Sequence, residues 1–266
     1  MYKDFTLVLG GGGARGIANI GVLKELKKRG LTPNKIIGVS MGALVGASFC
    51  SGKEIKEIEK EALRLNTKFK VIKHLFDIAK PGEAFIKGDK IKKFISRTIN
   101  QTTFKNLKIP LEILTTNLEK GNGEIIKNGK IIDAIMASIS VPGIFPPVKI
   151  NGSYYVDGGV TNPTPVDIAP TTIDQPTIAV DLTIQETVKL NKPGIITTMM
   201  RSYEIIRANS ILNHLPNNNK NVILLKPRAR KFIDSFKFYD VEKFIKAGEM
   251  IVKDNWREIE KLITKN

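Results

Sequence analysis

The 266-residue sequence predicts an α/β fold with a mainly parallel central sheet, because its first fifty residues contain two successive strand–helix units. In the first unit, an apolar strand over 5–9 precedes a helical pattern that ends at Gly30. In the second unit, a strand over 35–39 precedes a helix over 41–50. Such units align their strands in parallel, because the helix carries the chain back to the end of the sheet where the first strand began. Two glycine-rich turns, GGGGARG and GVSMG, should then lie together at the carboxyl end of these strands.

The rest of the chain continues the alternation of helices and strands. Further helices are expected over 53–66, 89–99 and 130–138, and further strands over 111–116, 154–156, 177–181 and 222–225, with a hairpin at 121–129. A long terminal helix is expected over 240–263, with an inner face of Val241, Phe244, Ile245, Met250, Ile251, Trp256, Ile259 and Leu262. No repeat or linker interrupts the pattern. We therefore expect one domain, in which 5–185 forms the catalytic core and 186–266 adds a strand and helices to it.

Composition narrows the class of protein. The single cysteine, Cys50, excludes an internal disulfide framework, lies in an apolar run typical of a buried thiol, and favours a reducing, cytoplasmic setting. No signal peptide is evident, and the charge-free stretch between Lys35 and Lys53 is shorter than the about 20 apolar residues of a membrane span. The net charge of +16 is spread over many runs without a nucleic-acid-binding motif. We expect no nucleic-acid partner, whereas peripheral contact with an anionic membrane is compatible with this charge.

The first glycine-rich turn matches a nucleotide-binding fingerprint only in part. Residues 11–16, GGGARG, satisfy G-x-G-x-x-G between a strand and a helix. The fingerprint also expects an acidic residue at the end of the second strand, where this chain has KIIGVS. A lysine followed by serine or threonine at the phosphate-loop spacing is missing as well. The interpretation as a nucleotide-binding loop therefore lacks the second residue that such a site requires.

The second turn, GVSMG, has the G-x-S-x-G pattern of a nucleophile elbow. It would raise the hydroxyl of Ser40 at the carboxyl end of the sheet, over the amino end of the next helix. A tight turn with an incidental serine is the alternative. If Ser40 is a nucleophile, the backbone N–H groups of Gly11, Gly12 and Gly13 could form an oxyanion hole, with help from the Met41 N–H.

A serine hydroxyl needs a base to become a nucleophile, and the chain offers histidines and carboxylates. By chain order His214 is the candidate for a catalytic triad, but it lies in the polar stretch LNHLPNNN, and His74 lies in a charged amphipathic segment. We expect both histidines to be surface or packing residues. Asp157 is the better candidate because it follows an apolar strand and precedes two glycines in YYVDGG. An ordinary Asp-Gly turn is the alternative for this aspartate.

Four motifs in this order, GGGARG, GVSMG, ASISVPGIFPPV and DGG, resemble the patatin-like phospholipase family. The resemblance implies a modified α/β-hydrolase core, a three-layer sandwich, and hydrolysis by a serine–aspartate dyad without histidine. Carried over by motif, Ser40 is the nucleophile, Asp157 is the base, and the first glycine loop is the oxyanion hole. The remaining motif positions in this chain are Arg15, Gly16, Gly38, Gly42, Gly158 and Gly159.

The same resemblance leaves two residue roles open. Arg15 occupies the basic position of the glycine loop, where it would pair either with a phosphate headgroup or with a structural acid. Ile144 and Phe145 in the third motif would line an acyl pocket or serve core packing.

Together these observations predict a lipid acyl hydrolase whose substrate is a lipid or fatty-acyl ester. A carboxylesterase or thioesterase acting on small acyl groups is one alternative, and a non-catalytic lipid-binding regulator is another. No His, Cys and acidic residues recur at metal-ligand spacing, so neither a metal nor a cofactor is expected. The sequence carries no signal for an oligomeric state.

Overall fold

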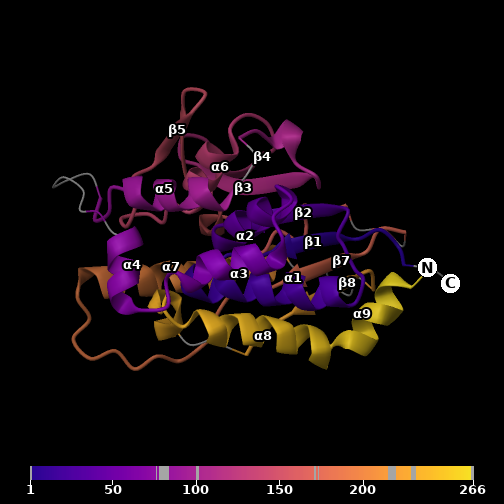
Figure 1. The fold of residues 1–266 in the computed structure, drawn as a ribbon. Coiled ribbons are helices and arrows are strands. Elements are labelled where there is room, and N and C mark those ends of the chain that lie inside the picture. Colours follow the sequence, from indigo (N-terminus) through magenta and orange to yellow (C-terminus); the bar gives the residue numbers. More distant parts are fainter. Residues whose placement is uncertain are drawn as a thin grey trace.

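Among the residues that the structure describes, eight strands form one mixed sheet at the centre of this computed structural model (Figure 1). The described residues are 2–75, 77, 84–99, 102–170, 172, 174–214, 220–228 and 232–264. The sheet order is β5-β6-β3-β2-β1-β7-β8, with β4 also paired to β3. The strands are β1 Thr6–Leu9, β2 Lys35–Val39, β3 Leu111–Asn117, β4 Asn122–Ile126, β5 Val148–Ile150, β6 Ser153–Asp157, β7 Thr177–Val180 and β8 Val222–Leu225.

The α-helices of the described chain are α1 Ala18–Lys28, α2 Met41–Cys50, α3 Ile55–Leu63, α4 Lys68–Leu75, α5 Asp89–Thr98, α6 Ile131–Ser138, α7 Ile195–His214, α8 Val241–Asp254 and α9 Trp256–Ile263. Short 3-10 helices are η1 Gly13–Ile17, η2 Phe104–Asn106, η3 Gly158–Val160 and η4 Phe232–Phe236. Both chain ends lie at the same end of the molecule (Figure 1), where the Lys3 N–H donates to the Ile263 carbonyl at 2.6 Å.

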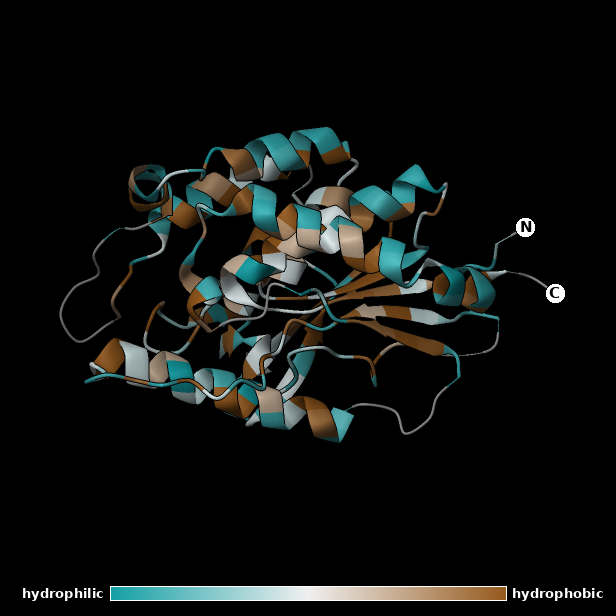
Figure 2. Ribbon diagram, turned by 90° about the horizontal axis from the view of Figure 1, so that it is seen from below, coloured by the Kyte–Doolittle hydropathy of each residue, from teal (hydrophilic) through white to brown (hydrophobic). Residues whose placement is uncertain are grey.

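The sheet is covered on both faces, as the alternation of buried side chains along β1 requires. Leu7 and Leu9 pack into the larger apolar cluster, which also contains α1, α2 and α8, whereas Val8 belongs to a smaller cluster with Val166 and Ala169. Figure 2 shows the strands as an apolar layer, with most helices on one side and α7 on the other. This arrangement confirms the predicted α/β class with a mainly parallel sheet.

Strand β3 brings two distant segments together. One edge of β3 pairs with β4, and the other edge pairs with two strands in succession, parallel β2 and then antiparallel β6. On that shared edge, Leu114 pairs with Val39, the last residue of β2. The next residue, Thr115, pairs with Asp157, the last residue of β6. Because β2 and β6 point toward each other, their carboxyl ends meet, and the residues that follow β2 face Asp157.

The carboxyl-terminal part differs from the prediction at two places. The long terminal helix is divided into α8 and α9 at Asn255, whose side-chain amide donates to the Ile251 carbonyl at 2.7 Å. Within α8 the buried positions follow helical spacing through Phe244, Gly248 and Val252, so Met250 lies off this face and is exposed, whereas Val252 is buried. Helix α7, which has twenty residues, was not predicted. Its buried positions include Glu204 and Arg207, so the usual apolar periodicity of a buried helix face is missing.

Candidate active site

Ser40 lies on a sharp turn between β2 and α2. Its φ of 54° is uncommon for a residue other than glycine, so surrounding contacts must hold it there. The Ser40 N–H donates to the Ser138 hydroxyl at 2.8 Å, and that hydroxyl donates to the Leu114 carbonyl at 2.7 Å. A side chain at Gly42 would collide with the Leu9 carbonyl, which explains the glycine after the turn. The elbow is therefore fixed by β1, β3 and α6 together.

The Ser40 hydroxyl donates to Asp157 Oδ2 at 2.7 Å. The other carboxylate oxygen, Oδ1, accepts the Gly159 N–H at 2.7 Å, so the DGG turn orients the aspartate. Both side chains are shielded from solvent, since Ser40 is 8% exposed and Asp157 is 1% exposed. The two residues that the sequence singled out separately thus form one hydrogen-bonded pair.

Burial raises the pKa of Asp157 above its ordinary value, because the charged carboxylate loses its water. Hydrogen bonds from Ser40 and Gly159 and the charge of Arg207 offset only part of this effect. Tyr203 also faces the carboxylate, and burial raises the pKa of its hydroxyl well above the ordinary value. Tyr203 therefore remains a neutral phenol that can donate a hydrogen bond, and Asp157 is a stronger base than an exposed aspartate.

The first glycine loop lies directly against Ser40. A Cβ atom built on Gly11 would be 3.0 Å from the Ser40 Cβ atom, so a larger residue would displace the serine. The Gly11 N–H already donates to the Pro163 carbonyl at 3.1 Å. Within the described chain, no acceptor is found for the N–H groups of Gly12 and Gly13. The geometry therefore narrows the available donors of the loop from three to these two.

A buried ion cluster supports the glycine loop from α7. Glu204 accepts hydrogen bonds from Arg15 Nη2 at 2.8 Å and from Arg207 Nη1 at 3.2 Å. Burial acts to raise the pKa of Glu204, but the two arginines outweigh it and hold that pKa below the ordinary value. The same arginines donate to the loop itself, Arg207 to the Gly11 carbonyl and Arg15 to the Gly12 carbonyl. Arg15 is fully buried, which favours the structural ion pair over a headgroup contact.

The third motif, ASISVPGIFPPV, has a positioning role that the sequence analysis missed. Besides the Ser138 contact, the Ser140 carbonyl accepts the Asp157 N–H at 2.9 Å. One short segment therefore holds the backbones of both Ser40 and Asp157. The sequence also missed Tyr203, Glu204 and Arg207, which lie on the helix that was not predicted. The one signal in the sequence is that the charged residues Glu204 and Arg207 stand among the apolar residues of 203–211.

Neither histidine contacts the pair. His214 ends α7, where its Nδ1 atom lies 2.8 Å from Asp167 Oδ2, and the polar residues 215–219 that follow are outside the described part. His74 lies on α4 and is half-buried. Cys50 is buried, and burial raises the pKa of its thiol, so it is an unreactive core residue. These positions agree with the expectation that no histidine assists Ser40.

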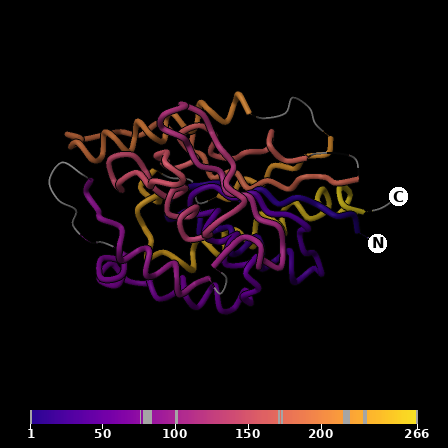
Figure 3. The backbone as a smooth tube through the Cα atoms, turned by 90° about the horizontal axis from the view of Figure 1, so that it is seen from above, coloured from indigo at the N-terminus to yellow at the C-terminus, as the bar shows by residue number. Residues whose placement is uncertain are grey.

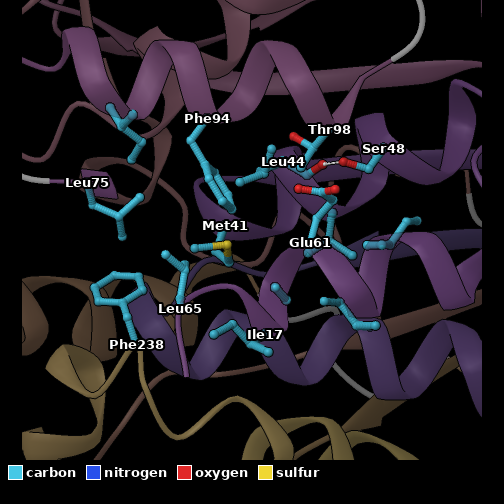
Figure 4. Close-up of a pocket in the computed structure, with 15 residues that line it drawn as sticks. Ile17, Met41, Leu44, Ser48, Glu61, Leu65, Leu75, Phe94, Thr98 and Phe238 are labelled. Carbon is cyan, nitrogen blue, oxygen red and sulfur yellow. Dashed lines mark hydrogen bonds between the residues drawn. The ribbon is translucent and has the colours of Figure 1, made fainter. Parts of the chain in front are cut away.

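An apolar pocket begins at Met41, the residue after the serine (Figure 4). Side chains from α1 to α5 line it almost entirely with carbon atoms, and Leu44, Leu65 and Phe94 form much of the wall. The close-up shows the polar side chains of Ser48, Glu61 and Thr98 gathered at one end. Ile144 and Phe145, expected at an acyl pocket, do not line this one. Residues of α1 to α5 form it instead.

The described residues contain no group of three or more His, Cys, Asp and Glu side chains that could hold a metal ion. None of their helices has the length and apolar character that a membrane-spanning helix needs.

A serine on a strand–helix elbow, hydrogen-bonded to a buried carboxylate beside unpaired backbone N–H groups, defines a site of the serine-hydrolase type. The family model described as patatin-like phospholipase matches residues 7–170, which is more than half of the chain. The chain belongs to the patatin-like phospholipase family. Helix α7 lies outside the matched range.

Curated relatives support this placement, and a solved structure shares the fold. The chain is 34% identical over 209 residues to neuropathy target esterase sws of Drosophila melanogaster, covering 73% of this chain and 15% of that protein. For the Drosophila grimshawi protein of the same name, the identity is 36% over 180 residues, covering 62% and 12%. The chain thus spans a small part of these relatives. The crystal structure of the type III effector ExoU has a TM-score of 0.51 at 14% identity, covering 97% of this chain and 54% of that one, which shows a shared fold.

Proposed function

We propose that the protein hydrolyses carboxylic esters of lipids, with Ser40 as nucleophile and Asp157 as its base. The observation that carries this proposal is the hydrogen bond of 2.7 Å between the Ser40 hydroxyl and Asp157 Oδ2. Membership of the patatin-like phospholipase family and similarity to proteins named esterases support the choice of a lipid ester. The family and the apolar pocket support the substrate class, and the geometry supports the dyad.

The first half of the reaction acylates the serine. As Ser40 Oγ attacks the ester carbonyl, its proton moves to Asp157 Oδ2, and the raised pKa of this carboxyl favours the transfer. The carbonyl oxygen becomes an oxyanion, which the N–H groups of Gly12 and Gly13 stabilise. When the carbon–oxygen bond of the ester breaks, Asp157 returns the proton to the departing alcohol. The acyl group is then bonded to Ser40.

The second half releases the fatty acid. Water attacks the acyl-enzyme carbonyl, Asp157 accepts a proton from that water, and the same glycine N–H groups hold the second oxyanion. Collapse of the intermediate breaks the bond to Ser40 Oγ, which takes the proton back from Asp157. The N–H of Gly159 keeps the carboxylate aligned through both halves.

We further propose that the acyl chain enters the pocket beside Met41. Burial of methylene groups against Leu44, Leu65 and Phe94 would stabilise bound lipid by about 0.8 kcal/mol per buried CH₂ group. The polar end with Glu61 would limit the chain length that fits. Filling the middle of the pocket with a large side chain, as in Leu44→Trp, should therefore reduce hydrolysis of long-chain esters more than that of acetate esters.

The test is a hydrolysis assay on a panel of a diacyl phospholipid, a lysophospholipid, a triacylglycerol and a short-chain aryl ester, with mass spectrometry of the products. The wild type should release free fatty acid from at least one lipid, and Ser40→Ala should release none. Ser51→Ala is the matched control, because Ser51 is a buried serine at the opposite end of α2 whose hydroxyl donates to the Ser48 carbonyl. Cleavage of only the short-chain ester would contradict the lipid substrate. A folded wild type that cleaves no ester would contradict hydrolysis itself.

A further inference from the structure

Helix α4 holds two apolar side chains out into solvent. Phe69 is 73% exposed and Ile72 is 61% exposed, while Val71 and Leu75 on the opposite face anchor the helix to the protein. Burying a phenylalanine or isoleucine normally stabilises a fold, so two such neighbours left exposed indicate a surface that meets something else. The two residues are three positions apart and therefore project from the same side of the helix.

The same helix is strongly basic. Lys68, Lys70 and Lys73 flank the two apolar residues and are exposed, and residues 62–75 contain no aspartate or glutamate. Lys68 lies 5.5 Å from the Tyr239 ring centre and Lys70 donates to Asn66, but none of the three is in an ion pair among the described residues. An apolar pair with three neighbouring lysines has the chemistry of a helix that lies in the interface of an anionic membrane.

A second segment has the same character. Ile195 at the amino end of α7 is 75% exposed, and Leu190 and Ile196 are exposed with it. Lys189 precedes Leu190, Lys192 lies between Leu190 and Ile195, and residues 187–203 contain no acidic residue. Two segments more than a hundred residues apart thus combine protruding apolar side chains with uncompensated positive charge.

Both segments lie at the functional end of the molecule. The parallel strands run away from the chain ends, and α4 and the amino end of α7 are at the opposite end (Figure 1). Seen from above, they occupy opposite sides of that end, α4 in purple and α7 in orange (Figure 3). The carboxyl end of β2, which carries Ser40, points the same way. A flat surface that touched both segments would therefore face the end of the sheet where the Ser40–Asp157 pair lies.

We propose that Phe69 and Ile72 of α4, with Ile195 of α7, form a membrane-docking surface that enters the headgroup region of an anionic bilayer, while the five neighbouring lysines contact lipid phosphates. The proposed function gives this surface its purpose, which is to bring ester lipids to Ser40. Binding itself does not require hydrolysis. Charge complementarity selects an anionic bilayer over a second copy of this chain, because a second copy would bring the same lysines against one another.

The test is flotation of the full chain with vesicles of phosphatidylcholine alone and of phosphatidylcholine mixed with phosphatidylserine. The wild type should float with the mixed vesicles, stay behind with the neutral ones, and lose binding as salt rises. Phe69→Ser with Ile72→Ser should abolish flotation. Lys68→Gln, Lys70→Gln and Lys73→Gln together should weaken it by about fivefold for each lysine removed. The charge-matched control is Lys56→Gln, Lys246→Gln and Lys261→Gln, which alters exposed lysines elsewhere and should bind better than the α4 variant.

Three results would overturn the proposal: equal flotation with neutral and mixed vesicles, wild-type flotation of the α4 variants, or a dimer without lipid that the apolar substitutions abolish. All surface variants should hydrolyse a water-soluble short-chain ester as the wild type does, which shows that they are folded. If the wild type floats through this surface but hydrolyses no ester, the docking surface stands and the proposed function fails.

Discussion

Two regions build the site in different ways. The motif region, from the first glycine loop to the Ser40 elbow, acts mainly through its backbone, and its glycines let strands, loop and serine approach closely. Helix α7 acts through side chains, since Tyr203, Glu204 and Arg207 extend from it toward the aspartate and the glycine loop. The serine and the glycine-loop N–H groups are thus in one region, and much of what orients that loop and Asp157 is in the other.

The difference shows why the motifs alone describe an incomplete site. A glycine-rich loop is free to change shape, so its N–H groups stabilise an oxyanion only if other residues fix the loop. Here the carbonyl groups of Gly11 and Gly12 are fixed by Arg207 and Arg15, and both arginines depend on Glu204. Variants in the two regions can therefore separate the catalytic role of the glycine loop and Ser40 from the role of α7 in positioning them.

The largest effect on folding is expected for Glu204→Gln, which removes the negative charge that contacts both buried arginines. Breaking a buried ion pair by removing one partner costs about 3–5 kcal/mol, so the free energy of unfolding should fall by about this amount in urea titrations. Glu260→Gln, an exposed glutamate on α9, is the matched control and should change it little. If Glu204→Gln is as stable as the control, α7 does not support the loop through this cluster.

A somewhat smaller effect, on catalysis, is expected for Gly12→Val. The new Cβ atom would lie 2.9 Å from the Leu182 Cβ atom, so the loop must shift and its N–H groups would no longer point at the oxyanion. Loss of one oxyanion donor costs about 2.7–4 kcal/mol, or about a hundredfold to a thousandfold in kcat for a soluble ester. Gly194→Ala is the control, because its Cβ atom would meet no other atom within 4 Å. Unchanged kcat in Gly12→Val would remove this loop from the mechanism.

Ser138→Ala tests the support given by the third motif. The substitution leaves the Ser40 N–H and the Leu114 carbonyl without their partner, at a cost of about 1–3 kcal/mol. If the loss of these hydrogen bonds displaces the Ser40 hydroxyl, kcat should fall by about tenfold while KM changes little. Ser140→Ala is the comparison. It removes a hydroxyl that donates to the Met136 carbonyl but keeps the backbone carbonyl that accepts the Asp157 N–H, so this variant should retain more activity. Equal activity of the two variants would contradict a positioning role for the Ser138 hydroxyl.

The smallest effect is a shift in pH dependence. Asp157 must be deprotonated to accept the serine proton, so kcat/KM should fall as the pH drops through its pKa. Because burial raises this pKa, the acid limb should lie above the value of about 3.9 for an exposed aspartate. The hydrogen bond from Tyr203 lowers the pKa of Asp157, so Tyr203→Phe should move the limb to higher pH.

Tyr155→Phe is the control for this shift, since Tyr155 lies on the same strand as Asp157 but its hydroxyl donates to Glu124. An acid limb at the same pH in Tyr203→Phe and the wild type would show that Tyr203 does not act on Asp157.

The sequence was sufficient to predict the α/β fold and to single out the two residues of the hydrogen-bonded serine–aspartate pair. The strand–helix units and the two glycine turns are local patterns, and parallel strands bring local patterns together at one edge. The end-to-end meeting of β2 and β6 on β3 was not predictable, because it depends on the register between strands far apart in the chain.

Helix α7 could not be predicted for a related reason. Its inner face carries Glu204 and Arg207, which are buried in an ion cluster that Arg15 joins from elsewhere in the chain, and its outer face exposes Ile195 and Leu212. This reverses the pattern on which recognition of a helix depends. The break at Asn255 was missed because a side-chain hydrogen bond, rather than proline or glycine, ends α8.

The central claim is that Asp157 alone activates Ser40, and the most direct test is covalent labelling by a fluorophosphonate followed by peptide mass spectrometry. The wild type should carry the label on Ser40. Asp157→Asn should slow labelling by at least about a hundredfold, the contribution typical of a general base, while His74→Asn and His214→Asn should label at the wild-type rate. Labelling of Ser48 or Ser51 in place of Ser40, or a folded His214→Asn protein that labels as slowly as Asp157→Asn, would contradict the dyad.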